Sequence, residues 1–255
     1  VMIFNGEIYN HNEIRMELNS LHERKWTGHS DTETLLEAIE QWGLETTLNK
    51  TKGMFSIALW DKRNRNLYLS RDRMGEKPLY YGWVDNQFVF ASELKAIKKF
   101  PKFNNSIDRN ALALFLRFNS IPSPYSIYED IFKLEPGTII QFNADSKKIV
   151  KNTYWSTEEE IIKSSSSAFS GNFEDAVNQL ELILSKAVSS QMESDVPLGA
   201  FLSGGVDSSL IVALMQSQSG QKVNTFSIGF NNVDFNEAEH ASMVAKHLGT
   251  NHSEL

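Results

Sequence analysis

The sequence predicts two successive domains, an α+β domain with an antiparallel sheet and then an α/β domain with a doubly wound parallel sheet. The first observation is a change in the order of the predicted elements, because helices followed by hairpin-like strands give way to strands that alternate with helices. The second is the serine-rich stretch 156–172, which has few apolar residues and is typical of a linker. The third is the length of 255 residues, which suits two domains of ordinary size. We therefore place the domains at 1–155 and 173–255.

Residues 1–155 show the signals of helices followed by hairpins. Apolar residues at helical spacing predict one helix over 14–21 and a second that stops at Gly43. The second helix begins with Ser30-Asp31-Thr32-Glu33, which has the spacing of a capping box. Asp85-Asn86 suits a tight hairpin between the last two predicted strands. The predicted strands cover 55–61, 67–72, 79–83 and 88–92.

Residues 173–255 alternate strands and helices, and their strands are apolar enough to be buried, which indicates a parallel sheet. Gly249 stands where the last helix should stop. The predicted order is a helix over 173–192, a strand over 198–202, a helix over 210–215, a strand over 225–229 and a helix over 238–248.

Composition and charge exclude several classes of protein. No apolar run approaches the roughly 18 residues that span a bilayer, and no secretory leader is visible, so we expect a cytoplasmic protein without a membrane role. The absence of cysteine excludes disulfides and thiolate metal sites. Residues 173–255 hold 3 Lys and Arg against 10 Asp and Glu, which accounts for the whole net charge of −7. This acidity disfavours a nucleic-acid partner and favours small-molecule substrates.

The two ends of the chain lack the signals of complete elements. Met2-Ile3-Phe4 has the pattern of the end of a buried strand, and His252-Ser253-Glu254-Leu255 leads towards an apolar element that does not follow. We therefore expect a fragment that is truncated at both ends.

The segment Leu202-Ser203-Gly204-Gly205-Val206-Asp207-Ser208-Ser209 predicts a phosphate-binding loop. It lies between a predicted strand and a predicted helix, where an open α/β sheet binds its ligand. The helix N-terminus offers unpaired N–H groups, the two glycines permit close approach to an anion, and the three serines add hydroxyl groups. The alternative is a helix cap without a ligand, but the flanking elements and Asp207, a candidate Mg²⁺ ligand, favour the phosphate loop. The loop of kinases and GTPases is excluded, because the Gly-Lys-Ser/Thr ending is missing.

Asn5-Gly6-Glu7, together with Asp31, forms a second candidate site. An Asn side-chain amide beside a Gly N–H can donate two hydrogen bonds to one developing oxyanion. Glu7 and Asp31 offer two carboxylates for the ammonium group of an amino acid. Spacing alone favours the alternative, a turn followed by a surface helix whose N-terminus Asp31 merely stabilises.

Two sets of motifs resemble known families. Residues 203–208 resemble the pyrophosphatase loop of the ATP-pyrophosphatase superfamily, and 226–230 resemble its second strand. The further segments 5–10, 30–33, 71–81 and 91–96 resemble the glutamine-hydrolysing asparagine synthetases. The resemblance covers essentially the whole chain, and the order of the motifs is itself specific.

The resemblance implies an N-terminal-nucleophile glutaminase domain, an αββα sandwich, followed by an ATP-pyrophosphatase domain. Asn5 and Gly6 would form the oxyanion hole, and Asn5, Glu7 and Asp31 would bind glutamine. The family's nucleophile is an N-terminal cysteine, and this chain has none. If Val1 is a truncation point, we expect the cysteine upstream; if it is the true start, the glutaminase would be inactive.

In the second domain the resemblance places ATP and pyrophosphate against the loop 203–209, Leu202 and Ile228, although plain core packing would also explain Leu202 and Ile228. The implied reaction makes asparagine from aspartate, glutamine and ATP through β-aspartyl-AMP, with Mg²⁺ accompanying ATP and with release of AMP and pyrophosphate. The alternatives are an amidotransferase or β-lactam-synthetase-like enzyme for another carboxylate, and a non-catalytic nucleotide-binding protein. A homodimer is left open.

Overall fold

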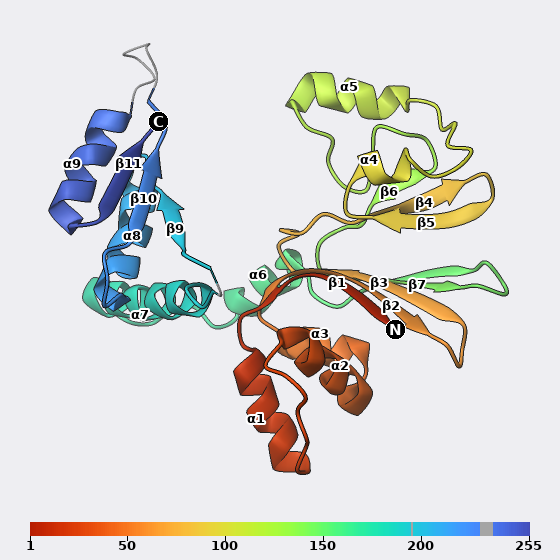
Figure 1. The fold of residues 1–255 in the computed structure, drawn as a ribbon, viewed down its shortest axis with the longest axis horizontal. Coiled ribbons are helices and arrows are strands. Elements are labelled where there is room, and N and C mark those ends of the chain that lie inside the picture. The colour runs from red at the N-terminus through yellow and green to blue at the C-terminus, as the bar shows by residue number, and fades with distance from the viewer. Residues whose placement is uncertain (195, 230–236) are drawn as a thin grey trace. The chain divides into compact units, whose positions relative to one another are not determined.

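The computed structural model describes residues 1–194, 196–229 and 237–255. These form two compact units, Val1–Ser167 and Ala168–Leu255 (Figure 1). The boundary between them falls inside the stretch 156–172.

Unit 1 (Val1–Ser167) contains two antiparallel sheets. The five-stranded sheet has the order β1-β2-β3-β7-β8, and the three-stranded sheet has the order β5-β4-β6. The strands are β1 (Met2–Ile8), β2 (Gly53–Asp61), β3 (Asn66–Arg71), β4 (Tyr80–Val84), β5 (Gln87–Ala91), β6 (Ile131–Lys133), β7 (Thr138–Asn143) and β8 (Ile149–Thr153). The helices are α1 (His11–Leu21), α2 (Asp31–Trp42), α3 (Leu44–Lys50), α4 (Leu94–Ile97), α5 (Arg109–Phe118) and α6 (Thr157–Ser165).

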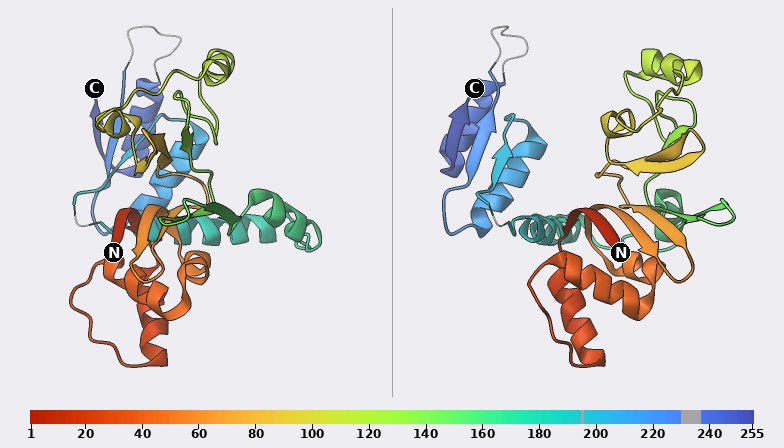
Figure 2. Two further views of the ribbon diagram at one scale, coloured as in Figure 1. Left: turned by 90° about the vertical axis from the view of Figure 1, so that its right-hand side faces the viewer. Right: turned by 45° about the vertical axis from the view of Figure 1, so that its right-hand side comes forward.

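Three apolar clusters separate four layers in unit 1 (Figures 1 and 2). The first, with Leu18 and Phe55, lies between the helices α1 to α3 and the five-stranded sheet. The second lies between the sheets, where Phe88 of β5 stacks on Phe142 of β7 with ring centroids 4.2 Å apart. The third, with Ile97, lies between the three-stranded sheet and α4. The predicted αββα sandwich is confirmed.

Local signals are reproduced in part: α3 to α5, β6 to β8 and β11 (Asn251–Glu254) were not predicted, and two further expectations need correction. Asp85 and Asn86 both have positive φ, as a tight hairpin between β4 and β5 requires. The predicted capping box is only half formed, because Ser30 accepts from the N–H of Glu33 but the Glu33 carboxylate accepts from Thr27 and Gly28 instead. The stretch predicted to have little structure contains α6, which the sequence interpretation missed and which has no buried residue.

Unit 2 (Ala168–Leu255) contains the predicted parallel sheet, with strand order β11-β10-β9. Helix α9 has the predicted bounds, and α8 begins four residues earlier than predicted, directly after the glycine pair. Residue 230, in the motif 226–230, lies outside the described residues. The elements are α7 (Phe173–Gln191), β9 (Gly199–Phe201), α8 (Val206–Gln218), β10 (Asn224–Ser227), α9 (Ala238–Leu248) and β11 (Asn251–Glu254). Within the described part of the chain, no helix is long and apolar enough to cross a membrane.

Candidate functional site

The first candidate site lies along the free edge of β1, which is the outermost strand of its sheet. Val1 and Trp60 exchange both backbone hydrogen bonds, 3.0 and 2.7 Å long, and Tyr9 N–H donates to Lys52 at 2.8 Å. Because hydrogen-bonded pairs alternate in an antiparallel ladder, the odd-numbered residues of β1 bond to β2. The N–H groups of Gly6 and Ile8 therefore point away from β2, to the free edge.

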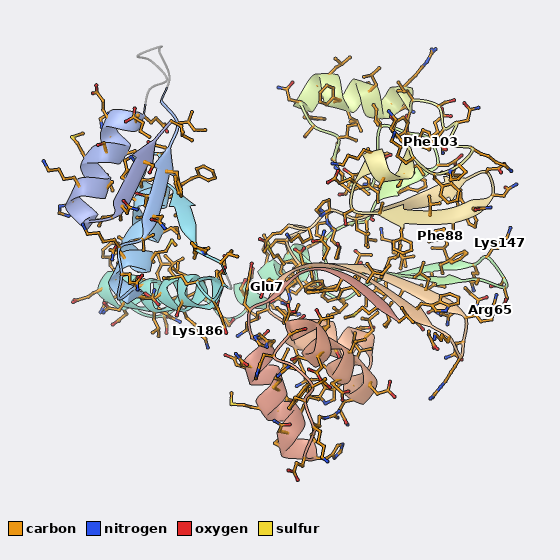
Figure 3. The ribbon with its side chains drawn as sticks, in the orientation of Figure 1. Glu7, Arg65, Phe88, Phe103, Lys147 and Lys186 are labelled. Atoms are coloured by element: carbon orange, nitrogen blue, oxygen red, sulfur yellow. The ribbon has the colours of Figure 1, made fainter. Side chains whose placement is uncertain are left out.

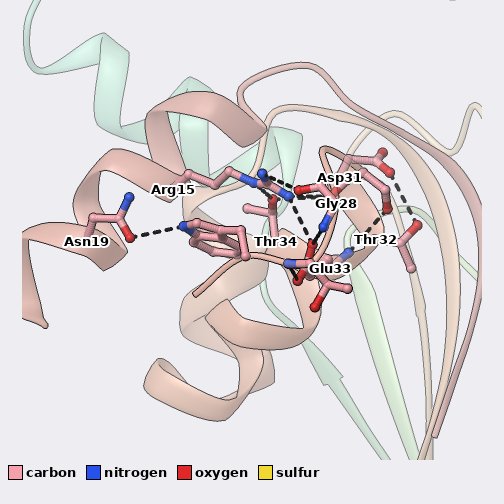
Figure 4. A network of polar contacts seen from close by, with 10 residues as sticks. Arg15, Asn19, Gly28, Asp31, Thr32, Glu33 and Thr34 are labelled. Carbon is pink, nitrogen blue, oxygen red and sulfur yellow. Dashed lines mark hydrogen bonds and ion pairs between the residues drawn. The ribbon is translucent and has the colours of Figure 1, made fainter. Parts of the chain in front are cut away.

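Asp31 meets this edge at the end of β1. Its Oδ2 accepts from the N–H of Ile8 at 2.9 Å, and its Oδ1 accepts from the Thr32 hydroxyl at 3.3 Å. Ile8 directly follows Glu7, so the structure brings both predicted carboxylate residues to one end of the strand (Figure 3 labels Glu7, Figure 4 labels Asp31).

Asn5 and Gly6 are the residues predicted to form an oxyanion hole. The exposed Asn5 side chain donates from Nδ2 to the Ser92 hydroxyl at 3.2 Å, and since an amide nitrogen carries two hydrogens, one remains for a ligand. A Cβ on Gly6 would lie 2.1 Å from the carbonyl oxygen of Met54. Close packing of β1 on β2 therefore requires glycine here, whatever else its N–H does.

A polar network fixes the segment that carries Asp31 (Figure 4). The Arg15 guanidinium donates to the carbonyls of Gly28 and Ser30 at 2.9 and 3.0 Å and to the Thr34 hydroxyl at 2.6 Å. Glu33 accepts from the N–H groups of Thr27 and Gly28, and these bonds lower the pKa of Glu33. The loop before α2 is thereby held on α1.

Asp72, which sequence reasoning did not place in the site, organises the loop behind it. Its carboxylate is 1% exposed and accepts from four backbone N–H groups. These belong to Phe55 (3.2 Å), Met74 (3.1 Å), Glu76 (2.9 Å) and Lys77 (3.0 Å). The buried Arg71 likewise donates to the carbonyls of Gly75, Lys77 and Leu134. Both residues hold the loop 72–77 through its backbone.

The electrostatic field beside Glu7 is negative. Burial raises the pKa of Tyr9, and the carboxylates of Glu76, Glu7 and Asp72 raise it further. Three acidic groups thus act on one ring next to the end of β1. Such a field favours a cationic ligand group, such as an ammonium.

The second candidate site is the loop between β9 and α8. Ser208 Oγ accepts from the N–H of Ser203 at 3.2 Å, lies 2.9 Å from Ser203 Oγ and donates to the carbonyl of Gly205 at 3.3 Å. Ser203 Oγ in turn accepts from the N–H of Gly205. The two hydroxyls therefore hold the loop in shape, and the donors left for an anion are mainly the backbone N–H groups at the start of α8.

Two further features distinguish this loop: its backbone packs closely on α9, and it contains a buried hydroxyl group without a hydrogen-bond partner among the described residues. Gly204 has φ +80°, and a Cβ there would lie 2.7 Å from Cβ of His240 on α9. The Ser209 hydroxyl is buried and has no hydrogen-bond partner among the described residues. Asp207 is exposed in the first turn of α8. It is the loop's one carboxylate, and no group of three or more His, Asp or Glu able to hold a metal occurs among the described residues.

A cavity of about 220 Å³ lies at the carboxyl end of the parallel strands. It brings together Leu202, Ser203 and Ile228, which the sequence placed at one nucleotide site. Leu202 is buried in the core with Val212 of α8, whereas the Ile228 side chain is 56% exposed. The other lining residues are Phe201, Phe226, Ser227, Glu237 and Ala238. A larger cavity of about 710 Å³ in unit 1, lined in part by Val1 and Leu59, includes none of the predicted site residues.

Comparison with known proteins gives a family match in each of the two units. A family model described as a glutamine amidotransferase domain matches residues 1–155. The chain belongs to this family. A second model, described as asparagine synthase, matches residues 179–255.

The curated relatives of this amidotransferase chain carry related names. It is 36% identical to a putative glutamine-hydrolysing asparagine synthetase 2 of Methanocaldococcus jannaschii, over 99% of the chain and 47% of the relative. It is 35% identical to glutamine-hydrolysing asparagine synthetase 1 of Bacillus subtilis, over 97% of the chain and 37% of the relative. A solved glutamine phosphoribosylpyrophosphate amidotransferase of B. subtilis has a TM-score of 0.45 and 15% identity, with 100% of the chain and 70% of that protein covered.

These matches confirm the predicted resemblance to the glutamine-hydrolysing asparagine synthetases. The chain spans about half or less of the length of these two relatives.

Proposed function

We propose that this chain is part of an enzyme that makes asparagine from aspartate, with ammonia from glutamine and energy from the cleavage of ATP to AMP and pyrophosphate. One observation supports the proposal: a single chain combines a glutamine amidotransferase domain over residues 1–155 with a match to asparagine synthase over residues 179–255, where a loop follows a parallel strand.

In the glutaminase half, Asn5 Nδ2 and the Gly6 N–H stabilise the oxyanion that forms at the glutamine side-chain amide. Glu7 and Asp31 bind the α-ammonium group of glutamine in the negative field that also acts on Tyr9. The chain contains no cysteine, so the thiolate nucleophile of this proposal lies in a part of the protein outside the 255 residues.

In the synthetase half, the backbone N–H groups at the start of α8 bind the phosphates, and the cavity beside Leu202 and Ile228 receives the base. An aspartate side-chain oxygen attacks the α-phosphorus and pyrophosphate leaves. Ammonia then attacks the acyl carbon, the C–O bond to AMP breaks, and asparagine forms with loss of a proton. Asp207 would hold Mg²⁺ jointly with the phosphates, and the ion would neutralise their charge.

The test uses the protein expressed from its complete gene, supplied with aspartate, ATP and either glutamine or ammonium. We expect asparagine, AMP and pyrophosphate in equal amounts with either nitrogen source, and glutamate only with glutamine. Production of ADP contradicts the loop assignment. Product formation with ammonium but not with glutamine contradicts the glutaminase assignment and leaves the synthetase half standing.

A further inference from the structure

The loop that leads to Asp31 has little apolar packing of its own. Residues 22–30 join α1 to α2, and none of them is buried. Trp26 packs against the apolar cluster of Leu18 and Phe55 but stays partly exposed. Asp31 follows this loop directly, as the first residue of α2. The place of the Asp31 backbone therefore depends on the polar contacts that hold the loop.

Arg15 of α1 holds the loop through its backbone (Figure 4). Its guanidinium donates to the carbonyls of Gly28 and Ser30 at 2.9 and 3.0 Å. Its Nε donates to the Thr34 hydroxyl, in the first turn of α2, at 2.6 Å. Because a guanidinium only donates and a carbonyl oxygen only accepts, chemistry alone fixes the direction of the two backbone bonds. Arg15 thus grips the chain on both sides of Asp31.

Glu33 holds the same loop from α2. Its carboxylate accepts from the N–H groups of Thr27 and Gly28 at 2.7 and 2.9 Å, and it forms an ion pair with Arg15 at 3.4 Å. The side chain of Arg15 is 12% exposed and that of Glu33 is 26% exposed. Because the two charges are opposite and adjacent, the pair acts on Asp31 mainly through the backbone and little through its net field.

We propose that Arg15 is a positioning residue of the glutaminase site. By holding Gly28 and Ser30 it places the Asp31 carboxylate at the end of β1, where that carboxylate recognises the α-ammonium group of the substrate. The inference rests on the proposed function, in which Asp31 binds this group. The ammonium lies away from the amide that reacts, so loss of Arg15 should weaken substrate binding and leave the chemical step little changed.

The test compares two substrates of the protein expressed from its complete gene. One is glutamine, and the other is glutaramate, which is glutamine with a hydrogen in place of its α-amino group. Arg15→Lys keeps the positive charge but loses the planar fork that reaches two carbonyls. We expect the KM for glutamine to rise roughly tenfold, as for the loss of one hydrogen bond to a charged group, with kcat little changed. The value of kcat/KM for glutaramate should not change.

Arg24→Lys is the matched control. The Arg24 side chain is 16% exposed and forms an ion pair with Glu37 of α2. It also donates to Gln41 at 2.7 Å, so among the described residues its partners are side chains of α2. This change should lower thermal stability about as much as Arg15→Lys does, and it should leave the preference for glutamine over glutaramate intact.

Thr34→Val is a milder change at the same contact, because it removes only the hydroxyl that accepts from Arg15. It should raise the KM for glutamine in the same direction but by less. If circular dichroism shows that Arg15→Lys does not fold, Thr34→Val decides the matter, and an unchanged KM then contradicts the inference.

Three further outcomes overturn the inference. If Arg15→Lys lowers kcat/KM for glutamine and glutaramate by the same factor, the role of Arg15 is only structural. If Arg15→Lys folds and the KM for glutamine does not change, Asp31 keeps its place without Arg15. In both of these cases the proposed function stands. If the wild-type protein hydrolyses neither substrate, the glutaminase half of the proposed function fails as well.

Discussion

The candidate amide site of unit 1 consists mainly of side chains at a strand edge, together with the N–H of Gly6, and the buried polar residues Asp72 and Arg71 hold the loop behind it. The candidate phosphate site of unit 2 is the reverse, because its ligand groups are backbone N–H donors and its side chains, Ser203 and Ser208, hold the loop. The two units also differ in architecture. Unit 1 has four layers with three apolar clusters between them, whereas unit 2 is built on a sheet of short parallel strands.

The difference shows where each site is vulnerable. In unit 1 the loss of a ligand-binding side chain should impair chemistry and leave the fold intact, whereas loss of a buried support should impair the fold. In unit 2 most side-chain substitutions leave the backbone N–H groups in place, so loss of phosphate binding should follow from changes that move the backbone.

The largest effect should follow Asn5→Ala in the glutaminase reaction of the protein from the complete gene. Loss of one oxyanion donor lowers kcat by roughly 100- to 1,000-fold, with little change in thermal stability because Asn5 is exposed. Ser92→Ala removes only the hydrogen bond that holds the Asn5 amide and should lower kcat less than Asn5→Ala does. An unchanged kcat with a raised KM for glutamine would show that Asn5 only binds the substrate.

Asp72→Asn should destabilise unit 1 next most strongly, by about 2–3 kcal/mol, because the amide cannot accept four backbone N–H bonds as the carboxylate does. Chemical denaturation monitored by tryptophan fluorescence measures the loss. Asp85→Asn is the control, since its ion pair with Lys102 is exposed to solvent and contributes little to stability. Equal effects of the two changes would contradict the supporting role of Asp72.

Gly204→Ala should weaken ATP binding roughly tenfold or more, because it strains a backbone with φ +80° against α9 at a cost of about 1–3 kcal/mol. Gly205→Ala is the matched control, since φ is −71° there and the nearest atom to a new Cβ is Ser203 Oγ at 3.3 Å. Isothermal titration with ATP compares the two. If both changes are harmless, the loop backbone does not hold the phosphates.

The smallest effect concerns alkaline stability. Burial, with a contribution from Glu135, raises the pKa of Tyr81 from 10 to about 12. The folded state therefore binds the phenolic proton more tightly than the unfolded state, and this stabilisation is present below pH 10 and is lost as the pH rises from 10 to about 12. Tyr81→Phe should make the fall of unfolding free energy over this range shallower, though not zero, since burial also raises the pKa of Tyr154. Identical slopes would contradict the shift.

Local signals account for what could be predicted from the sequence. Helix α9 has the predicted bounds because both of its signals are local. The spacing of its apolar residues identifies the helix, and Gly249, with φ +75°, ends it. The β4–β5 hairpin follows from two adjacent residues in the same way. By contrast, β7 and β8 were missed because β7 is recognised through its pairing with β3, about 70 residues earlier, and β8 only through its pairing with β7.

The site residues show the same distinction between local signals, which the sequence reveals, and long-range contacts, which it does not. The residues Asn5, Gly6, Asp31 and the loop 203–209 belong to short motifs, and a resemblance could find them. The hydrogen bond from Asn5 to Ser92 and the one from Phe55 to Asp72 join residues that are 87 and 17 positions apart. Spacing along the chain carries no signal for such contacts.

The most direct test of the account is the fate of oxygen in the activated carboxylate. Aspartate labelled with ¹⁸O in its side-chain carboxylate is supplied with ATP and ammonium to the protein from the complete gene. If the loop 203–209 supports adenylation, the oxygen that attacks the α-phosphorus leaves with the nucleotide, and one ¹⁸O appears in AMP for each asparagine formed. Label in inorganic phosphate, with ADP as the nucleotide product, would contradict the account.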